Sequence, residues 1–583
     1  MINLLCRHFL THFLLTVCGV RIAADRAQDV PHIGADQIGG GHPGADLVIP
    51  TDARLCTGMS LHRRAQVPLE RADLVALDAK SQGIHHPDQF LGFGIARPRS
   101  GAQFGHRLRK LPRLHQIAGL FQFCPNRVCQ TNARQKSDKS PTQIRHVFHG
   151  LSLSFLLASP ALAQTLPAPL TEADFFQFDQ AKVKLGRLLF YDKILSGNQN
   201  ISCASCHHPD LGTTDGVSLG IGEGGMGLGT KRVSAEDSSR IHKRIPRNAP
   251  ALWNLAYRDL RNMFHDGRLE ISDIYGNGFN SPAREWLPTG LQTIMAAQAV
   301  LPLTAEHEMA GNPGENEIAG AVKDRIDSGW PIIAKRVRNN PSYAKLFVTA
   351  FDTIDSPGQV GIADIANAIA AFIGTEFRNF DSPYDKYLAG DSNALSPTQK
   401  RGLDLFFGDA GCSGCHNGQL LTDQGFYALS LPQFGPGRTR AFDPLPRDVG
   451  RMGESDRLED AYKFRTPALR NVALTGPYGH NGAMPTLESM VRHHLNPRQS
   501  LASWAPDMAG LPKVAWLQNA DFAIRDDRFE MERQLAALDI TPVDMSDRQV
   551  TDIVAFLHAL TGETAKTLTL GVPDVVPSGL PVD

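Results

Sequence analysis

The sequence predicts a mainly α-helical protein built from two similar domains that long loops connect. Three observations predict this fold class. A C-x-x-C-H motif occurs twice, at Cys203–His207 and at Cys412–His416. Similar segments, Gly186-Arg-Leu-Leu-Phe190 and Gly402-Leu-Asp-Leu-Phe406, precede the two motifs and indicate an internal duplication. Capping boxes and apolar residues at helical spacing recur along the chain, whereas strand patterns are weak throughout.

Three segments carry the clearest helix signals. Ile362 to Phe377 has apolar residues at helical spacing and runs into a predicted turn at Asn379–Pro383. Ser396-Pro-Thr-Gln399 combines an N-cap, a proline at the first helical position and a capping-box glutamine, so a helix begins there. Ser546-Asp-Arg-Gln549 is another capping box, and the apolar residues that follow it predict an amphipathic helix ending near Leu560.

The length of 583 residues allows about two to four domains. We place a domain boundary near Gly390–Leu395, so that residues 164–392 and 393–583 each hold one motif. The stretch between the first motif and residue 370 contains glycine- and proline-rich loops. Within it, Gly220–Gly225 matches G-x-G-x-x-G, but no strand precedes it and no helix follows. We therefore expect a flexible loop near the first motif.

Each C-x-x-C-H motif can attach one c-type haem, because its two thiols reach two vinyl groups and its histidine offers an imidazole to the iron. A lone C-x-x-C would also suit half a zinc site or a thioredoxin-like redox pair. Two copies, each followed directly by histidine, favour haem. The sequence thus predicts a redox protein with two covalently bound haems, through Cys203, Cys206 and His207 and through Cys412, Cys415 and His416.

The segment from Gly150 to Gln164 resembles a secretory signal peptide, with an apolar run followed by Ala161-Leu-Ala163. It lies about 150 residues too far into the chain for a signal. Our hypothesis is that residues 1–163 are a mis-assigned extension plus the signal peptide, with cleavage near Ala163. The alternative is a genuine N-terminal domain, in which Met1 to Val20 serves as the signal or anchor.

The cysteines fit export to the periplasm. After cleavage near Ala163, four of the nine cysteines remain, all in the two motifs, so we expect no structural disulfide. The formal net charge of −1 gives no indication of nucleic acid as a partner. The interrupted apolar run at the N-terminus argues against an integral membrane protein. The oligomeric state stays open.

With these residues in view, residues 180–562 resemble the bacterial dihaem cytochrome c peroxidase and MauG superfamily. The motifs that carry the resemblance occur in the family's order. They are Leu185 to Asp192, Arg247-Asn-Ala-Pro250, Asp266-Gly-Arg268, Gln298 to Met309, Phe464 to Asn471 and Pro477 to Gly482. The resemblance implies two cytochrome c-like haem domains packed together, with a peroxide-reactive N-terminal haem and a C-terminal haem that stores or relays an electron.

The resemblance also implies site residues. Glu308 would be the acid-base group that moves a proton between the peroxide oxygens, Gln298 its partner, and Pro302 would pack over the same face. Asn248, Thr475 and Pro477 fall where the family places a calcium ion, for which oxygen ligands are suitable.

The distal ligand of the second haem departs from the family. His494 stands where the peroxidases have Met and MauG has Tyr, and His493, Met484 and Met490 are alternatives. A His/His iron should have a lower potential than a His/Met iron.

Two further departures concern the first haem and the space between the haems. His265 replaces the family's Trp before Asp-Gly-Arg, so interhaem electron transfer would take another route. His242 lies too close to Asn248 to match the histidine that blocks the first haem. We therefore expect a five-coordinate first haem that needs no reductive activation. His208 and His242 stay open as alternative ligands.

Three functions compete. The first is a periplasmic oxidoreductase acting on peroxide, which reduces hydrogen peroxide with electrons from a small redox protein. The second is a MauG-like oxidase that uses peroxide to oxidise Trp or Tyr side chains of a partner protein. The third is a dihaem electron-transfer cytochrome without peroxide chemistry.

Overall fold

The computed structural model describes residues 166–440 and 443–583. The expected extension and signal peptide, residues 1–163, lie outside the described residues. The described part is mainly helical, as predicted, with a few strands of two or three residues. None of its helices is both long and apolar enough to cross a membrane.

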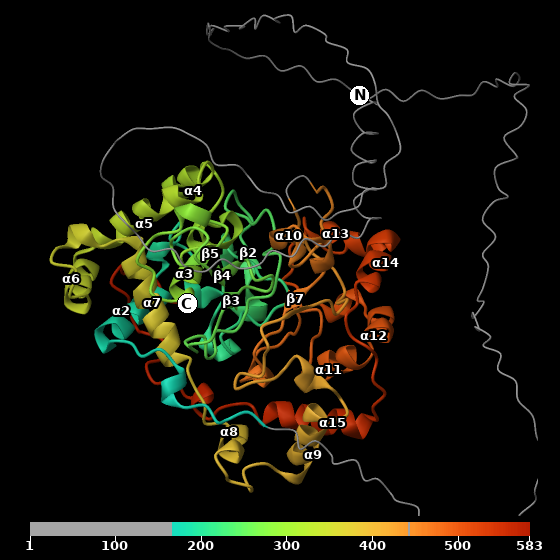
Figure 1. Ribbon diagram of the computed structural model, residues 1–583. Helices are drawn as coiled ribbons and strands as arrows, with labels where there is room; N and C mark the ends of the chain where they lie inside the picture. Colours follow the sequence, from blue (N-terminus) through green and yellow to red (C-terminus); the bar gives the residue numbers. More distant parts are fainter. Residues whose placement is uncertain (1–165, 441–442) are drawn as a thin grey trace, which may run out of the picture. The chain divides into compact units, whose positions relative to one another are not determined.

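The elements follow one another with long irregular connections (Figure 1). In the first half of the described chain the helices are α2 (Gln180–Tyr191), α3 (Ile294–Ala299), α4 (Glu317–Val322), α5 (Gly329–Arg338), α6 (Pro341–Ala350), α7 (Ile362–Glu376) and α8 (Pro383–Leu388). In the second half they are α9 (Pro397–Phe407), α10 (Met452–Ser455), α11 (Leu487–Leu495), α12 (Pro497–Ser503), α13 (Gln518–Asp521), α14 (Arg528–Ala536) and α15 (Asp547–His558).

The short strands form three small antiparallel sheets among these helices. The sheets pair β1 (Gly225–Met226) with β2 (Val233–Ser234), β3 (Asn262–Met263) with β4 (Leu269–Ile271) and β5 (Phe279–Asn280), and β6 (Phe426–Tyr427) with β7 (Phe464–Arg465). Strand β7 matters most for the site, because it pairs the Phe464-Arg-Thr-Pro run with β6, which follows the second motif.

The duplicated segments have the same structural role in both halves. Helix α2 packs against α7, and α9 packs against α15. A Cβ atom on Gly186 of α2 would lie 1.8 Å from the carbonyl oxygen of Ala368, and one on Gly402 of α9 would lie 1.9 Å from that of Asp552. Each glycine thus allows a helix that leads into a C-x-x-C-H motif to touch the backbone of a later helix.

The predicted helix signals are confirmed. Ser396 and Ser546 cap α9 and α15, and their capping boxes with Gln399 and Gln549 are formed. Helix α7 begins at Ile362, as predicted, and ends at Glu376. The expected turn before Pro383 is followed directly by α8, because Ser382 acts as its N-cap.

Two large hydrophobic clusters divide near, but not at, the proposed boundary, because Tyr384 belongs to the second and Leu420 to the first. The first contains buried residues of the segment from Leu170 to Phe377, and the second those from Tyr384 to Leu560. The end of the chain returns to the first cluster, where Ala565 and Val576 are buried. The division at residues 392/393 therefore remains a proposal, in which the last residues of the second part cover the first.

Candidate functional site

The two C-x-x-C-H motifs have the same local geometry. Each begins in a 3-10 turn, Cys203–Ser205 or Cys412–Gly414. The amide of His207 donates to the carbonyl of Cys203 at 3.0 Å, and the amide of His416 donates to that of Cys412 at 2.9 Å. The turn brings both thiols and the imidazole of a motif to one side of the chain, as a haem held by all three requires.

The proximal histidines are oriented by backbone carbonyls. Nδ1 of His207 lies 3.1 Å from the carbonyl oxygen of Thr213, and Nδ1 of His416 lies 3.1 Å from that of Leu421. An Nδ1–H that donates to a carbonyl leaves Nε2 unprotonated and available to a metal. Burial lowers the pKa of His416 to about 4, which also favours the neutral ring. Both histidines therefore fit the ligand role predicted for them.

His494 faces His416. The ring centres lie 6.3 Å apart, with an interplanar angle of 62°. Metal–imidazole bonds of about 2 Å on each side of one ion require ring centres about 6 Å apart. Nδ1 of His494 lies 2.9 Å from the carbonyl of Met490, so its Nε2 is available as well. The pair has the geometry of two axial ligands of one haem iron.

His493 has a different environment. Its ring is completely buried, Nδ1 contacts the hydroxyl of Ser500 at 3.0 Å, and Nε2 contacts the carbonyl of Leu429 at 2.8 Å. Both ring nitrogens are thus engaged within the protein. Met484 and Met490 pack in the hydrophobic cluster around Trp504. Of the four candidate ligands, His494 has the geometry that suits the role.

The predicted peroxide-handling residues lie in three successive short helical turns. Gln298 is in α3, Pro302 starts a 3-10 turn, and Glu308 is in the middle of a π-helical turn, Glu306–Ala310. The carbonyl of Ala305 accepts hydrogen bonds from the amides of residues 308, 309 and 310 at 3.0–3.1 Å. Such π turns occur frequently at functional sites.

Burial and the nearby arginines shift the pKa of Glu308 in opposite directions. Burial raises the pKa of its carboxyl group, while the nearby Arg268 and Arg438 lower it. The net direction is upward, which brings the carboxyl closer to the range in which it both accepts and releases a proton.

The glycine-rich loop supports this turn. A Cβ on Gly222 would lie 2.1 Å from the carbonyl oxygen of His307 and 3.0 Å from Cα of Glu308. The loop is buried, and the guanidinium of Arg232 donates to the carbonyls of Ile221 at 2.6 Å and Gly222 at 2.9 Å. The expectation of a flexible loop is therefore wrong, because Arg232 and the close contact with residues 307–308 fix its backbone.

His265 links the two halves of the site. Its Nε2 lies 3.0 Å from the carbonyl of Asn248, and its own carbonyl accepts from the amide of Arg465 at 2.7 Å. Asn248 lies two residues before Pro250, whose backbone contacts His207, and Arg465 lies two residues before Pro467, whose backbone contacts His416. The residue that replaces the family's Trp is thus hydrogen-bonded to the backbone next to both proximal ligands.

The proposed calcium ligands are only partly brought together. A Cβ on Gly482 would lie 3.1 Å from Nδ2 of Asn248 and 3.1 Å from Cγ of Pro477, so these two residues converge. The side chain of Asn248 donates to the carbonyl of Val217 at 2.8 Å, and the hydroxyl of Thr475 donates to that of Val472 at 3.0 Å. In the part of the chain that the structure describes, no cluster of three or more His, Cys, Asp or Glu could hold a metal ion. Calcium remains a prediction.

The two histidines considered near the first haem differ in their surroundings. His208 is buried and caps a 3-10 turn, with its Nδ1 accepting from the amide of Asp210 at 3.2 Å. His242 is exposed. The expected five-coordinate first haem stays a prediction.

A buried charge cluster between the motifs was not foreseen. Arg247, Arg268 and Arg438 all lie within 3.4 Å of Oδ2 of Asp266, and Arg247 also pairs with Asp448 at 2.8 Å. Although burial opposes it, these arginines hold the pKa of Asp266 well below its usual range. The signal was present in Asp266-Gly-Arg268, but the partners come from residues up to 182 positions away.

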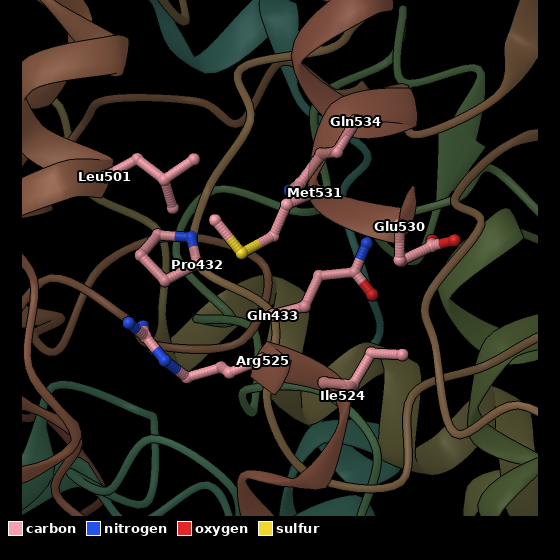
Figure 2. Close-up of a pocket in the computed structure, with 8 residues that line it drawn as sticks. All are labelled: Pro432, Gln433, Leu501, Ile524, Arg525, Glu530, Met531 and Gln534. Carbon is pink, nitrogen blue, oxygen red and sulfur yellow. The ribbon is translucent and has the colours of Figure 1, made fainter. Parts of the chain in front are cut away.

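A small cavity lies elsewhere, in the region 497–545 for which the sequence suggested no role (Figure 2). Its lining combines apolar and polar side chains from the loop after Leu431 and from α12 and α14. They are Pro432, Gln433, Leu501, Ile524, Arg525, Glu530, Met531 and Gln534. None of them is a predicted site residue.

Comparison with known proteins identifies the family of the chain. The family model for di-haem cytochrome c peroxidase matches residues 180–393. The cytochrome-c peroxidase IdrP1 of Denitromonas iodatirespirans is 32% identical over 352 residues, covering 57% of this chain and 76% of that protein. The methylamine utilization protein MauG of Methylorubrum extorquens is 28% identical over 384 residues, covering 66% and 79%.

A solved structure, a MauG-like protein associated with microbial copper homeostasis, is 27% identical and covers 70% of this chain and 96% of its own, with a TM-score of 0.45. The sequence relatives decide the classification. The family binds two c-type haems, and its members are oxidoreductases that act on peroxide. The chain belongs to the di-haem cytochrome c peroxidase family, which includes MauG.

Proposed function

We propose that the protein is a periplasmic peroxidase that reduces hydrogen peroxide to water with electrons from a small redox protein. The observation that carries the proposal is the unequal environment of the two proximal histidines. His416 is opposed by His494 at 6.3 Å between ring centres, whereas the segment predicted to face His207 presents Glu308. One site is thus suited to hold charge and the other to handle peroxide.

The reaction consumes one hydrogen peroxide, two electrons and two protons and releases two molecules of water. The haems, when bound, supply the redox chemistry. In our proposal a carboxyl oxygen of Glu308 takes a proton from one peroxide oxygen and returns it to the other, which then leaves as water. Gln298, in the preceding helix α3, would orient the peroxide by hydrogen bonding. The raised pKa of Glu308 supports this role, because a fully ionised carboxylate would return the proton poorly.

The second candidate is a MauG-like oxidase that withdraws electrons from Trp or Tyr side chains of a partner protein. The His416–His494 pair favours it, because a His/His iron should have a lower potential than a His/Met iron and should accept electrons from a cytochrome less readily. Family membership assigns the chain to the enzymes, so the third reading, an electron-transfer cytochrome, is not retained.

Two measurements distinguish the candidates. Addition of stoichiometric peroxide to the oxidised holoprotein should change its optical spectrum under either enzymatic proposal. Turnover with a reduced cytochrome c or a small copper protein would favour the peroxidase. Oxidation of a partner's Trp or Tyr without such turnover would favour the MauG-like activity.

Glu308→Gln tests the site. The amide cannot relay a proton, and we expect peroxide turnover to fall by about 10²–10⁴-fold, the contribution of a positioned acid-base group. Glu306→Gln is a matched control, because Glu306 lies in the same π turn but is exposed. Equal turnover of the Glu308 variant and the wild type would exclude the proposed role of Glu308.

A further inference from the structure

Arg465 forms no ion pair with an acidic residue in the part of the chain that the structure describes. Its Nε donates to the carbonyl of Phe264 at 3.2 Å and its Nη1 to that of Thr466 at 3.2 Å. Among the described residues, no carboxylate lies within ion-pair distance of its guanidinium. Burial lowers the pKa of Arg465 to about 10, and no acidic group opposes this effect.

Three buried arginines of the chain are paired with carboxylates. Arg247 contacts Asp266 and Asp448, Arg244 binds Asp521 through two nitrogens, and Arg470 contacts Asp385. Removing a guanidinium from water costs free energy that a carboxylate recovers and backbone carbonyls recover only in part. Arg232 is also buried, but three of its nitrogens donate to backbone carbonyls. An anion outside the polypeptide would give Arg465 the kind of partner that Arg244, Arg247 and Arg470 have.

The position of Arg465 indicates which kind of anion could bind to it. Its amide donates to His265, between the two haem-attachment sites, and it lies two residues before Pro467, which contacts the ring of His416. Arg268 stands beside it, with its guanidinium 3.7 Å from the ring centre of Phe264, the residue whose carbonyl binds Arg465.

Positive charge is in excess here. Three arginines, Arg247, Arg268 and Arg438, share Asp266, and Asp448 compensates only Arg247. Arg438 also contacts Glu454 at 2.9 Å, which leaves Arg268 and Arg465 without a full counter-charge.

Each haem carries two propionate carboxylates, and a guanidinium matches a carboxylate with two parallel hydrogen bonds. We propose that Arg465, assisted by Arg268, binds a propionate carboxylate of one of the two haems and raises the reduction potential of that haem. A cation close to a haem stabilises the added electron, so its removal should favour the oxidised form. The inference depends on the two haems of the family and not on the proposed peroxidase activity.

The test is a spectroelectrochemical titration of the haem-loaded Arg465→Gln variant without peroxide. We expect the reduction equilibrium of one haem to shift at least tenfold toward the oxidised state, which is about 59 mV for one electron. The haem that shifts is the one whose propionate is bound. Arg465→Lys keeps the charge and should recover most of the potential.

A matched control is Arg525→Gln. Arg525 is also half-buried without a carboxylate partner among the described residues, but it stacks on Trp504 in the region 497–545. We expect both haem potentials to stay unchanged in this variant. Unchanged potentials in Arg465→Gln would overturn the proposal and assign Arg465 a purely structural role.

A second measurement covers the case in which Arg465→Gln fails to fold. The propionate bending mode in the resonance Raman spectrum reports hydrogen bonding to that group, and it should shift in Arg465→Lys, which lacks the planar fork. An unshifted mode in the folded lysine variant would also overturn the proposal. Absence of peroxidase activity in the wild-type holoprotein, together with the expected potential shift in Arg465→Gln, would contradict the proposed function and leave this inference intact.

Discussion

Replacing His493 and His494 in turn should separate a structural histidine from an iron ligand. In His493→Leu, the carbonyl of Leu429 and the hydroxyl of Ser500 each lose a buried hydrogen bond of 2.8 or 3.0 Å. Each polar group left without a partner costs about 1–3 kcal/mol, so the free energy of unfolding should fall by about 2–6 kcal/mol. The axial ligands should not change.

His494→Met should have the opposite effects. His494 contacts the carbonyl of Met490 through Nδ1. This carbonyl lies inside α11, where the helix supplies its own hydrogen bond. The free energy of unfolding should therefore fall by only about 0.5–1.5 kcal/mol. Its second haem should acquire a His/Met signature and a higher reduction potential.

Electron paramagnetic resonance of the oxidised holoprotein reports both axial ligand sets, and denaturant unfolding reports the stability. If His493→Leu abolished the His/His signal while His494→Met preserved it, our assignment would be wrong. A His/His signal retained in both variants would equally refute the geometric argument from the 6.3 Å ring separation.

Two further predictions concern stability. Gly402→Ala should destabilise the chain by about 1–3 kcal/mol or more in denaturant unfolding, because its Cβ would overlap the carbonyl oxygen of Asp552. Gly320→Ala in α4 is the control, because its Cβ would meet nothing within 4 Å and alanine favours the helix. A similar loss of stability in both variants would contradict the importance of the contact with Asp552. Burial raises the pKa of Asp215 from 3.8 to about 7. Between about pH 4 and 7 the folded chain therefore keeps a proton that the unfolded chain loses. The free energy of unfolding should fall over this range and then level off. Asp215→Asn should therefore be more stable than the wild type at pH 8 and equal to it below pH 4; the same pH profile for both proteins would show that Asp215 is not the cause.

The helical elements could be predicted because their signals are local. Ser396 with Gln399 and Ser546 with Gln549 are complete within four residues and form as expected. The glycine-rich loop was misread for the opposite reason. Its rigidity depends on contacts with Arg232 and with the backbone of residues 307–308. The residues around Gly222 contain no local pattern that predicts these contacts.

The site divides in the same way. Cysteine spacing alone indicates where haem is attached, since the thiols and the imidazole of each motif belong to five consecutive residues. The resemblance to the family favoured His494 over His493, but it left His493 open. The tertiary structure adds the physical reason, because both ring nitrogens of His493 contact Leu429 and Ser500.

The sequence by itself determined that this chain carries two haem-attachment motifs, each preceded by a duplicated segment with a glycine at the same place. These features could be predicted because covalent attachment of haem and close contact between helices each depend on a short run of residues. Only the tertiary structure decided which histidine faces His416 and which arginine between the sites lacks a counter-charge. Those properties arise from residues such as Asp266, Arg438 and Arg465, which are far apart in the chain and meet only after folding.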